Sequence, residues 1–525
     1  MKLILIYKTV FQLILLIIFT ACKNSQITQD KPNIILIYAD DFGKGLLGHE
    51  GQQIIKTPNI DKLAEEGLRF QNAYSCMLCA PARASFLTGL HDCHSPKFEI
   101  SNAGIYKKIS TGEYTHSEVE SLINERLSLV PEEMVFLGEV AKKAGYTTAQ
   151  FGKLEWGFAT SHYQMKRHGW DYYFGYLDHV RAHGFYPPFL FSNGELIKIN
   201  GNTLINCGKS IEPETQKAYD ERWDMMGKEV YSQHIFMDSV LSFISTNKDH
   251  PFFLFFPTQL PHGPVSIPAV HKDFIKDDRL SQIEKEYASM VKLLDDNVGL
   301  ILQQLKSLNI DNNTIVIFTS DNGHEIYYEM EGRVHKPYTN MNTGEIFDNL
   351  TSKYYSDIGG DIFDGNGGRA GLKRSNLQGG IEVPLIIRWP NRIRTGRVSK
   401  RLVANYDILP TVAEITGFSK PLYTDGISFY DELIENETEI KHKFIVYSSF
   451  LGPTLITNDG WKIRSYLAAD IFELYYLPDD FREENDLSDK YPGKLTELKS
   501  ELLKACSGDF KNGLYSSRKS QIRIE

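Results

Sequence analysis

Four short runs along the chain are rich in β-branched, aliphatic and aromatic residues and end abruptly in polar residues. They cover residues 33–38, 147–151, 252–256 and 314–318. Short runs without a regular polar face are typical of strands that are buried on both faces of a parallel sheet. The pattern therefore predicts a sheet whose central strands are covered on both sides.

Segments with helical periodicity lie between these runs. Apolar residues recur at helical spacing through residues 290–305, and residues 134–144 form a second such segment that Gly145 closes. Strands alternating with helices indicate an α/β fold with a large, mostly parallel central sheet. In such sheets ligands bind beyond the carboxyl ends of the strands, so the polar clusters that follow the strands are expected to converge.

The pattern changes toward the C-terminus. Residues 403–415 still fit a core helix, whereas residues 444–450, 461–464 and 472–476 fit short antiparallel strands. A length of 525 residues also exceeds what one hydrophobic core usually holds, roughly 250 to 300 residues. We expect a large domain over residues 32–440 and a smaller α+β subdomain with a short antiparallel sheet over residues 441–525.

The first residues predict export. Lys2 precedes an apolar run that ends at Cys22, too short to span a membrane but typical of a signal peptide. The segment Phe19-Thr20-Ala21-Cys22 resembles the bacterial lipobox, in which the cysteine is lipidated and becomes the first mature residue. We expect a signal peptide over residues 1–21, lipidation of Cys22 and a tether over residues 22–31. This places the protein on the periplasmic or cell-surface side of a bacterial envelope, with membrane contact through the lipid anchor only. The alternative is an ordinary signal peptide with an incidental cysteine.

Charge and cysteine content exclude two classes of protein. The formal net charge of −10 makes a general nucleic-acid-binding surface unexpected, because such proteins usually carry a basic stripe. It does not exclude an anionic substrate, since a small cationic pocket can capture an anion whatever the global charge. The six cysteines are too few and too scattered for a disulfide scaffold.

The segment Cys79-Ala80-Pro81-Ala82-Arg83, followed by Leu87-Thr88-Gly89, identifies a family. It resembles the Cys-x-Pro/Ala-x-Arg signature of type I, formylglycine-dependent sulfatases. Similar landmarks begin at Thr57-Pro58-Asn59 and extend to Glu473-Leu474-Tyr475, so the resemblance covers nearly the whole mature chain. It implies an alkaline-phosphatase-like sandwich. The alternative reading of Cys76 and Cys79, a redox pair or half a zinc site, gives Arg83 no role.

The resemblance implies a catalytic role for this segment. In the family the cysteine, here Cys79, is converted to formylglycine by a maturation enzyme, which is therefore an expected partner. One hydroxyl of the hydrated aldehyde attacks sulfur and the other releases sulfate. Arg83 is expected to orient this diol, and the nucleophile is expected at a helix N-terminus, where backbone N–H groups favour an anion.

Four residues resemble the protein ligands of the family's single calcium ion. They are Asp40, Asp41, Asp321 and Asn322. Carboxylate and amide oxygens are the ligands that hard cations prefer, and each pair follows a predicted strand. Magnesium remains an alternative metal.

Three further residues match catalytic positions of the family. Lys153 and Lys373 match the lysines that bind sulfate oxygens, and His262 matches the histidine beside the leaving oxygen. A histidine suits proton donation near neutral pH. Many relatives carry a second histidine where this chain has Glu155, and two roles stay open for Glu155: the base that collapses the sulfated intermediate, or a structural group.

The segment 176–185 suggests the substrate. It is rich in aromatic and hydrogen-bonding residues and resembles bacterial carbohydrate sulfatases in which an Asp-His pair, here Asp178 and His179, reads the axial 4-hydroxyl. His324 is a weaker candidate for the same pocket. The expected substrates are sulfated oligo- or polysaccharides, with 6-O-sulfated galactose or N-acetylgalactosamine of host or algal glycans favoured. Two alternatives are a phosphate or phosphonate ester hydrolase of the same fold and a catalytically silent glycan-binding lipoprotein.

Overall fold

The structure is a computed structural model that describes residues 31–94, 104–126, 134–156, 160–210, 215–328, 338–339, 346–347, 353–436 and 439–515. The expected signal peptide, the lipidated Cys22 and the tether up to residue 30 lie outside these residues. Within the described part, no helix is both long enough and apolar enough to cross a membrane.

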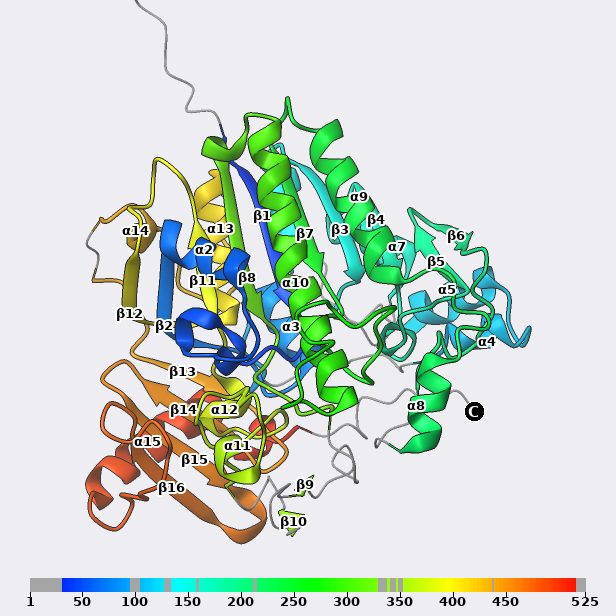
Figure 1. Ribbon diagram of the computed structural model, residues 1–525. Helices are drawn as coiled ribbons and strands as arrows, with labels where there is room; N and C mark the ends of the chain where they lie inside the picture. Colours follow the sequence, from blue (N-terminus) through cyan, green and yellow to red (C-terminus); the bar gives the residue numbers. More distant parts are fainter. Residues whose placement is uncertain are drawn as a thin grey trace, which may run out of the picture.

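A large twisted sheet runs through the molecule (Figure 1). Its ten strands have the spatial order β12-β2-β11-β8-β1-β7-β3-β4-β5-β6. The strands are β1 (Asn33–Ala39), β2 (Leu68–Tyr74), β3 (Thr147–Lys153), β4 (Tyr172–Tyr176), β5 (Phe189–Ser192), β6 (Glu195–Lys198), β7 (Phe252–Pro257), β8 (Thr314–Ser320), β11 (Leu385–Arg388) and β12 (Arg397–Ala404). The neighbours β8, β1, β7, β3 and β4 are all parallel, while β11 and β5 run opposite to the strands beside them. The sheet is thus mostly parallel, as expected.

Helices of the described residues cover both faces of this sheet, and others, among them the last one, pack elsewhere in the molecule. They are α2 (Pro58–Glu66), α3 (Cys79–Thr88), α4 (Lys107–Ser110), α5 (His116–Arg126), α6 (Leu137–Lys143), α7 (His162–Arg167), α8 (Gln216–Trp223), α9 (Ser232–Thr246), α10 (Gln282–Ser307), α11 (Ser356–Gly359), α12 (Gln378–Ile381), α13 (Ile408–Thr416), α14 (Tyr430–Leu433) and α15 (Pro492–Ala505). A two-stranded ribbon joins β9 (Tyr338–Thr339) to β10 (Ile346–Phe347).

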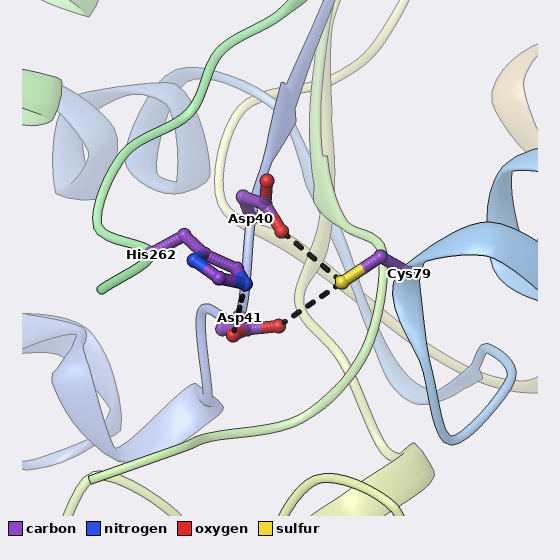
Figure 2. Close-up of side chains that lie close together, drawn as sticks. All are labelled: Asp40, Asp41, Cys79 and His262. Carbon is purple, nitrogen blue, oxygen red and sulfur yellow. Dashed lines mark hydrogen bonds and ion pairs between the residues drawn. The ribbon is translucent and has the colours of Figure 1, made fainter. Parts of the chain in front are cut away.

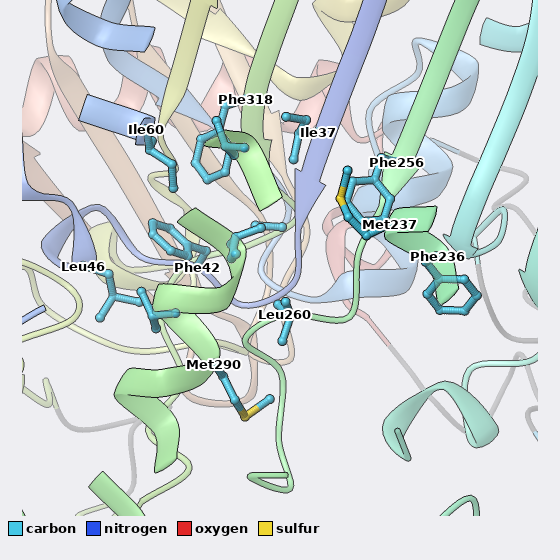
Figure 3. Packing of buried hydrophobic residues seen from close by; sticks show 14 of the residues in the cluster. Ile37, Phe42, Leu46, Ile60, Phe236, Met237, Phe256, Leu260, Met290 and Phe318 are labelled. Carbon is cyan, nitrogen blue, oxygen red and sulfur yellow. The ribbon is translucent and has the colours of Figure 1, made fainter. Parts of the chain in front are cut away.

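Strand β1 shows why both faces are covered. Successive side chains of a strand point to opposite faces, and every residue of β1 is buried. Ile35 and Ile37 belong to the core under α2, α9 and α10, whereas Ile34 and Leu36 belong to the core under α3, α6 and α13. Figure 3 shows the first core, where side chains of the sheet meet those of the covering helices. A strand with two apolar faces is stable only between two helical layers.

The C-terminal segment forms a separate antiparallel sheet (Figure 1). Its strands are β13 (Phe444–Tyr447), β14 (Thr454–Thr457), β15 (Trp461–Tyr466) and β16 (Ile471–Tyr476). Helix α15 packs on it through Leu498 and Leu502. Buried Lys462 of β15 pairs with Glu483 at 2.7 Å, and the Glu483 carboxylate accepts the backbone N–H of Gln378 at 2.6 Å. Glu483 therefore links the small sheet to α12 of the large domain, through an ion pair with Lys462 and a hydrogen bond from Gln378.

The structure corrects the sequence-based prediction at β12 and at β14. Residues 403 and 404, expected in a helix, end β12, and helix α13 begins only at Ile408. The Asp407 carboxylate accepts the backbone N–H of Ala404 at 2.8 Å, which turns the chain between the two elements. Strand β14 was not expected at all, because its four residues carry no strong apolar alternation.

Candidate active site

The centre of the site lies where the adjacent parallel strands β1 and β8 end. Asp40 and Asp41 follow β1, and Asp321 and Asn322 follow β8, so the register that pairs Ala39 with Ser320 brings the four side chains together. The backbone N–H of Asp41 donates to Asp321 Oδ1 at 3.0 Å. All four residues are buried. Parallel pairing of two strands distant in sequence thus builds the predicted acidic centre.

Cys79 is the first residue of α3 and points into this centre (Figure 2). Its thiol donates to Asp40 Oδ1 at 3.4 Å and to Asp41 Oδ1 at 3.6 Å. Burial, followed by the charge of Asp321, raises the pKa of the Cys79 thiol well above its ordinary value. An unmodified Cys79 is therefore a protonated thiol and a poor nucleophile at neutral pH.

Three basic side chains face the carboxylates. Lys153 Nζ lies 2.6 Å from Asp40 Oδ2, and Lys373 Nζ lies 2.6 Å from Asp41 Oδ2. Arg83 Nη2 lies 3.1 Å from Asp321 and 3.4 Å from Asp40. Burial alone would raise the pKa of Asp40, but the charges of Lys153, Arg83 and Lys373 outweigh it and hold that pKa well below its usual value. Asp40 is therefore ionised, and the site holds a dense cluster of opposite charges.

His262 closes the site from the loop after β7 (Figure 2). Its Nδ1 hydrogen-bonds to the carbonyl of Gly263, so Nδ1 carries the proton and Nε2 faces the site. Nε2 lies 3.2 Å from Lys373 Nζ and 3.5 Å from Asp41 Oδ2. Burial and the Lys373 ammonium lower the pKa of His262 to about 3. The ring is neutral in this arrangement, with an acceptor nitrogen directed at the charged groups.

The acidic centre fits a hard divalent cation. The side-chain oxygen of Asn322 is buried and has no hydrogen-bond partner among the described residues, although the same amide donates to Asp41 at 2.7 Å. Burial, followed by the charge of Asp40, raises the pKa of Asp321 to about 7. A cation bound by these oxygens would satisfy Asn322 and relieve the repulsion between the carboxylates.

Sequence reasoning missed two residues of the site. The hydroxyl of Tyr327, five residues after Asn322, donates to the Asp41 carboxylate. His183 stacks on His262 with ring centroids 4.3 Å apart. The only available signal was position: Tyr327 follows the motif after β8, and His183 lies inside the segment expected to contact substrate.

The structure favours the structural role for Glu155. Its two carboxylate oxygens accept from His168 Nδ1 at 2.6 Å and from Trp170 Nε1 at 2.5 Å, and all three side chains are buried. A base needs a carboxylate oxygen that can reach the reacting group, and both oxygens of Glu155 are already engaged.

Asp178 and His179, which were predicted to act together, have different surroundings in the structure. The Asp178 carboxylate accepts the backbone N–H groups of Tyr106 at 3.2 Å and of Arg181 at 3.1 Å, so it holds the local turn. Burial, followed by the charges of Lys153 and Arg83, lowers the pKa of His179 well below its ordinary value. His179 therefore belongs to the electrostatic environment of the site, whereas Asp178 shapes the backbone that carries it.

His324 lies behind the acidic centre. It is fully buried, hydrogen-bonds to the Tyr328 hydroxyl at 3.1 Å and lies 3.5 Å from Asp361 Oδ2. The Asp361 carboxylate also accepts the backbone N–H groups of Phe363 and Gly365 at 3.0 Å. These contacts support a packing role for His324 and do not support direct contact with a saccharide.

A second cluster of ligand-type residues lies beyond the C-terminal end of α3. His91, His94 and Asp425 line a cavity of about 360 Å³, with His94 Nε2 2.6 Å from Asp425 Oδ2. The two imidazole rings are stacked, 4.0 Å apart and within 2° of parallel. Lone pairs of parallel rings do not converge on one ion, so the cluster is a hydrogen-bonded group in this structure.

Comparisons with known proteins agree with the geometry. The family model described as Sulfatase matches residues 32–418, and one described as N-sulphoglucosamine sulphohydrolase, C-terminal, matches residues 372–507. The chain is 28% identical to human N-acetylgalactosamine-6-sulfatase over 410 residues. That alignment covers 77% of this chain but only 66% of the human protein, just under two thirds of its length.

Solved structures share the fold. A Bacteroides thetaiotaomicron sulfatase, solved in work on the metabolism of multiple glycosaminoglycans, has a TM-score of 0.67 at 22% identity and covers 91% of this chain and 100% of its own. Ps i-CgsB in complex with k-i-k-neocarrahexaose has a TM-score of 0.66 at 24% identity, with coverage of 93% and 96%. Both solved structures match more than nine tenths of this chain.

Proposed function

Because the chain belongs to the sulfatase family, we propose that it hydrolyses sulfate esters of carbohydrates, with Cys79 converted to formylglycine and one calcium ion bound. The observation that carries the proposal is the Cys79 thiol at the N-terminus of α3, 3.4 Å from Asp40 and 3.6 Å from Asp41. A buried side chain that faces carboxylates and cations at a helix N-terminus suits reaction with a tetrahedral anion.

The chain supplies the anion-binding groups. Lys153, Lys373 and Arg83 are positioned to neutralise sulfate oxygens, and the backbone N–H groups of the first turn of α3 add positive potential. Asp40, Asp41, Asp321 and Asn322 would hold calcium, which supplies further positive charge for the sulfate group. In the formylglycine form, residue 79 supplies a hydrated aldehyde whose two hydroxyls serve attack on sulfur and release of sulfate.

His262 is the group proposed to protonate the leaving sugar oxygen. Its Nε2 faces the site because Nδ1 is bonded to the Gly263 carbonyl. An anionic substrate next to the ring favours the protonated imidazole, which then has a proton to donate. The overall reaction consumes water, breaks the bond between sulfur and the sugar oxygen, and yields the free sugar hydroxyl and sulfate.

The proposed substrates are sulfated oligo- or polysaccharides, with 6-O-sulfated galactose or N-acetylgalactosamine favoured. One support is the 28% sequence identity to human N-acetylgalactosamine-6-sulfatase over 410 residues. The other is the fold shared with a sulfatase solved in work on glycosaminoglycan metabolism. His179, whose pKa is lowered by burial, Lys153 and Arg83, is the residue proposed to contact the sugar.

The decisive experiment is a desulfation screen. The chain is co-expressed with a formylglycine-generating enzyme, the peptide containing Cys79 is analysed by mass spectrometry, and sulfate release is measured on 6-, 4-, 3- and 2-O-sulfated Gal, GalNAc and GlcNAc. The matched control is Cys79→Ala, which puts another small side chain at this position but has no thiol that can be converted to the aldehyde. Conversion of Cys79 without turnover of any sugar sulfate would reject the proposal, and faster release of phosphate from phosphate esters would favour the alternative hydrolase. Absence of the aldehyde together with glycan binding would favour the silent lipoprotein.

We also propose export and lipidation at Cys22, supported by the lipobox-like segment that precedes it. The test is metabolic labelling with a fatty acid in a bacterial host, comparing the wild type with Cys22→Ser. Equal label in both proteins would reject the lipid anchor.

A further inference from the structure

The ring of His262 has two aromatic neighbours from other parts of the chain. The ring of His183 stacks on it, with centroids 4.3 Å apart and planes within 10° of parallel. The Tyr327 ring lies 5.1 Å away at 38°. His183 ends the short helix η3 (Arg181–His183) that follows β4 and is only partly buried, so it stands at the rim of the site. The nearly parallel stack covers one face of the His262 ring.

Gln259 connects the loops that carry the two histidines. Its side-chain amide donates to the carbonyl of Ala182 and, at 3.0 Å, to that of Gly184, the residues on either side of His183. Its own backbone carbonyl accepts the N–H of His262 at 2.8 Å. Gln259 is fully buried, so this clamp is shielded from water. One residue therefore sets the position of both rings.

The clamp is itself anchored on α9. The Gln259 side-chain oxygen accepts from Gln233 at 2.7 Å and from Ser232 at 3.0 Å, the residues that begin this helix. These bonds fix which end of the Gln259 amide donates, because the oxygen is already used as an acceptor. The NH₂ group is left to hold the His183 loop, and the stack is supported by a connected buried network.

The orientation of the His262 ring decides which atom faces the reaction. The Gly263 carbonyl fixes the proton on Nδ1, and the ring must hold its plane for Nε2 to stay 3.2 Å from Lys373. A histidine ring on a loop rotates readily about its side-chain bonds unless packing restrains it. A partner that covers one ring face supplies such a restraint without occupying Nε2.

We propose that His183 is a positioning residue for His262, held in place by Gln259, and that it acts on proton transfer to the leaving oxygen only through His262. The inference rests on the proposed sulfatase function.

The first test is a double-mutant cycle on the best sugar sulfate from the screen. His183→Ala should lower kcat by about 10- to 100-fold with little change in KM. General acid catalysis typically contributes a rate factor of at least about 100, so a misplaced His262 should lose up to that amount. In a His262→Ala background the same substitution should change kcat by less than about twofold, because effects that act through one group do not add. Multiplicative losses would overturn the proposal and indicate an independent substrate contact.

Two conservative variants separate stacking from other roles. His183→Phe keeps a flat ring and removes both ring nitrogens, so it should restore kcat to within about threefold of the wild type. Gln259→Glu keeps the size of the clamp and removes its N–H donors, so it should reproduce the loss seen with His183→Ala. A Phe variant no better than Ala would overturn the stacking role. His250→Ala, an exposed histidine, is the control and should leave kcat unchanged.

A structural readout keeps the proposal testable even without a known substrate. Crystal structures of the wild type and of His183→Ala should show the His262 ring turned away from Lys373 in the variant. An unchanged ring in the variant would overturn the positioning role. Failure of the wild type to desulfate any sugar would instead reject the proposed function, and the ring orientation would still report on His183.

Discussion

Lys153 Nζ lies 2.6 Å from Asp40 Oδ2, although Lys153 ends β3 and Asp40 follows β1, and these two strands are not neighbours in the sheet. Strand β7 separates β1 from β3, so the long lysine side chain spans the position of one strand. The contact shows how the carboxyl ends of three adjacent strands contribute to one charged centre.

Replacement of the nucleophile should abolish turnover. Cys79→Ser, expressed without a maturation system that acts on serine, leaves a single hydroxyl that cannot expel sulfate from its own ester. The check is sulfate release over many turnovers, with thermal unfolding as the control for folding. Sustained multiple turnover by the serine variant would remove Cys79 as the nucleophile.

Removal of a metal ligand should lower metal content and activity together. Asp321→Asn or Asp40→Ala takes a charged oxygen from a centre where burial and neighbouring carboxylates already raise the pKa of Asp321 to about 7. Metal content is measured by elemental analysis of the purified proteins. Chelation should lower the Tm of the wild type, because a cation that binds only the folded chain stabilises it, and should change the variants less. Full metal content in both variants would remove the two residues from the ligand set.

Glu382 should contribute to the loss of stability at acid pH. Burial alone would raise its pKa, but Arg369 at 2.7 Å and Lys44 at 2.7 Å outweigh burial and lower the pKa of Glu382 to about 2, from an ordinary value of 4.5. A folded-state pKa below the unfolded value gives stability that is complete above about pH 4.5 and is lost as the pH falls toward about 2. The unfolding free energy of the wild type, measured over this range, should decrease as the pH is lowered.

Glu382→Gln should reduce that pH dependence, with the rest left to other buried carboxylates whose pKa is lowered, such as Asp41 and Asp361, and should also destabilise the protein at neutral pH. The substitution leaves Lys44 and Arg369 without their buried carboxylate, which typically costs about 3–5 kcal/mol. Denaturant unfolding at pH 7 measures the loss. A variant as stable as the wild type would show that the two cations find other partners.

Glu155→Gln should separate the two roles of this residue. If Glu155 is structural, the variant disturbs the bonds from His168 and Trp170 and lowers the Tm, while kcat per folded molecule stays close to the wild-type value. If Glu155 acts as a base, kcat falls even where the Tm is maintained. The two quantities are measured on the same preparation.

His179→Ala should narrow the preference for a galacto over a gluco sugar. A site built around a hydroxyl loses discrimination when its partner is removed, and an unpaired buried polar group costs about 1–3 kcal/mol. The measurement is kcat/KM on 6-O-sulfated N-acetylgalactosamine and on its gluco epimer. Asp178→Ala should mainly lower the Tm, because its carboxylate holds backbone N–H groups of Tyr106 and Arg181. Equal wild-type rates on the two epimers would reject the substrate assignment and leave the family assignment intact.

The sequence by itself determined the central strands and the chemical groups at their ends. Strands β1, β7 and β8 are apolar runs whose boundaries were predicted within two residues, because a strand buried on both faces allows little but apolar side chains. Asp40, Asp41, Asp321 and Asn322 follow such strands, and parallel pairing brings them together at one edge of the sheet. Cys79 and Arg83 were marked by a local motif that needs no long-range contact to be recognised.

Only the tertiary structure decided the contacts of the residues on the surrounding loops. Glu155 is engaged by His168 and Trp170, His324 is buried against Tyr328, and His183 covers His262. None of these partners is set by spacing along the chain, because each depends on how a loop packs against its neighbours. A strand constrains its residues through a period of two, whereas a loop has no such period, so its side chains acquire their functions only when the layers have packed.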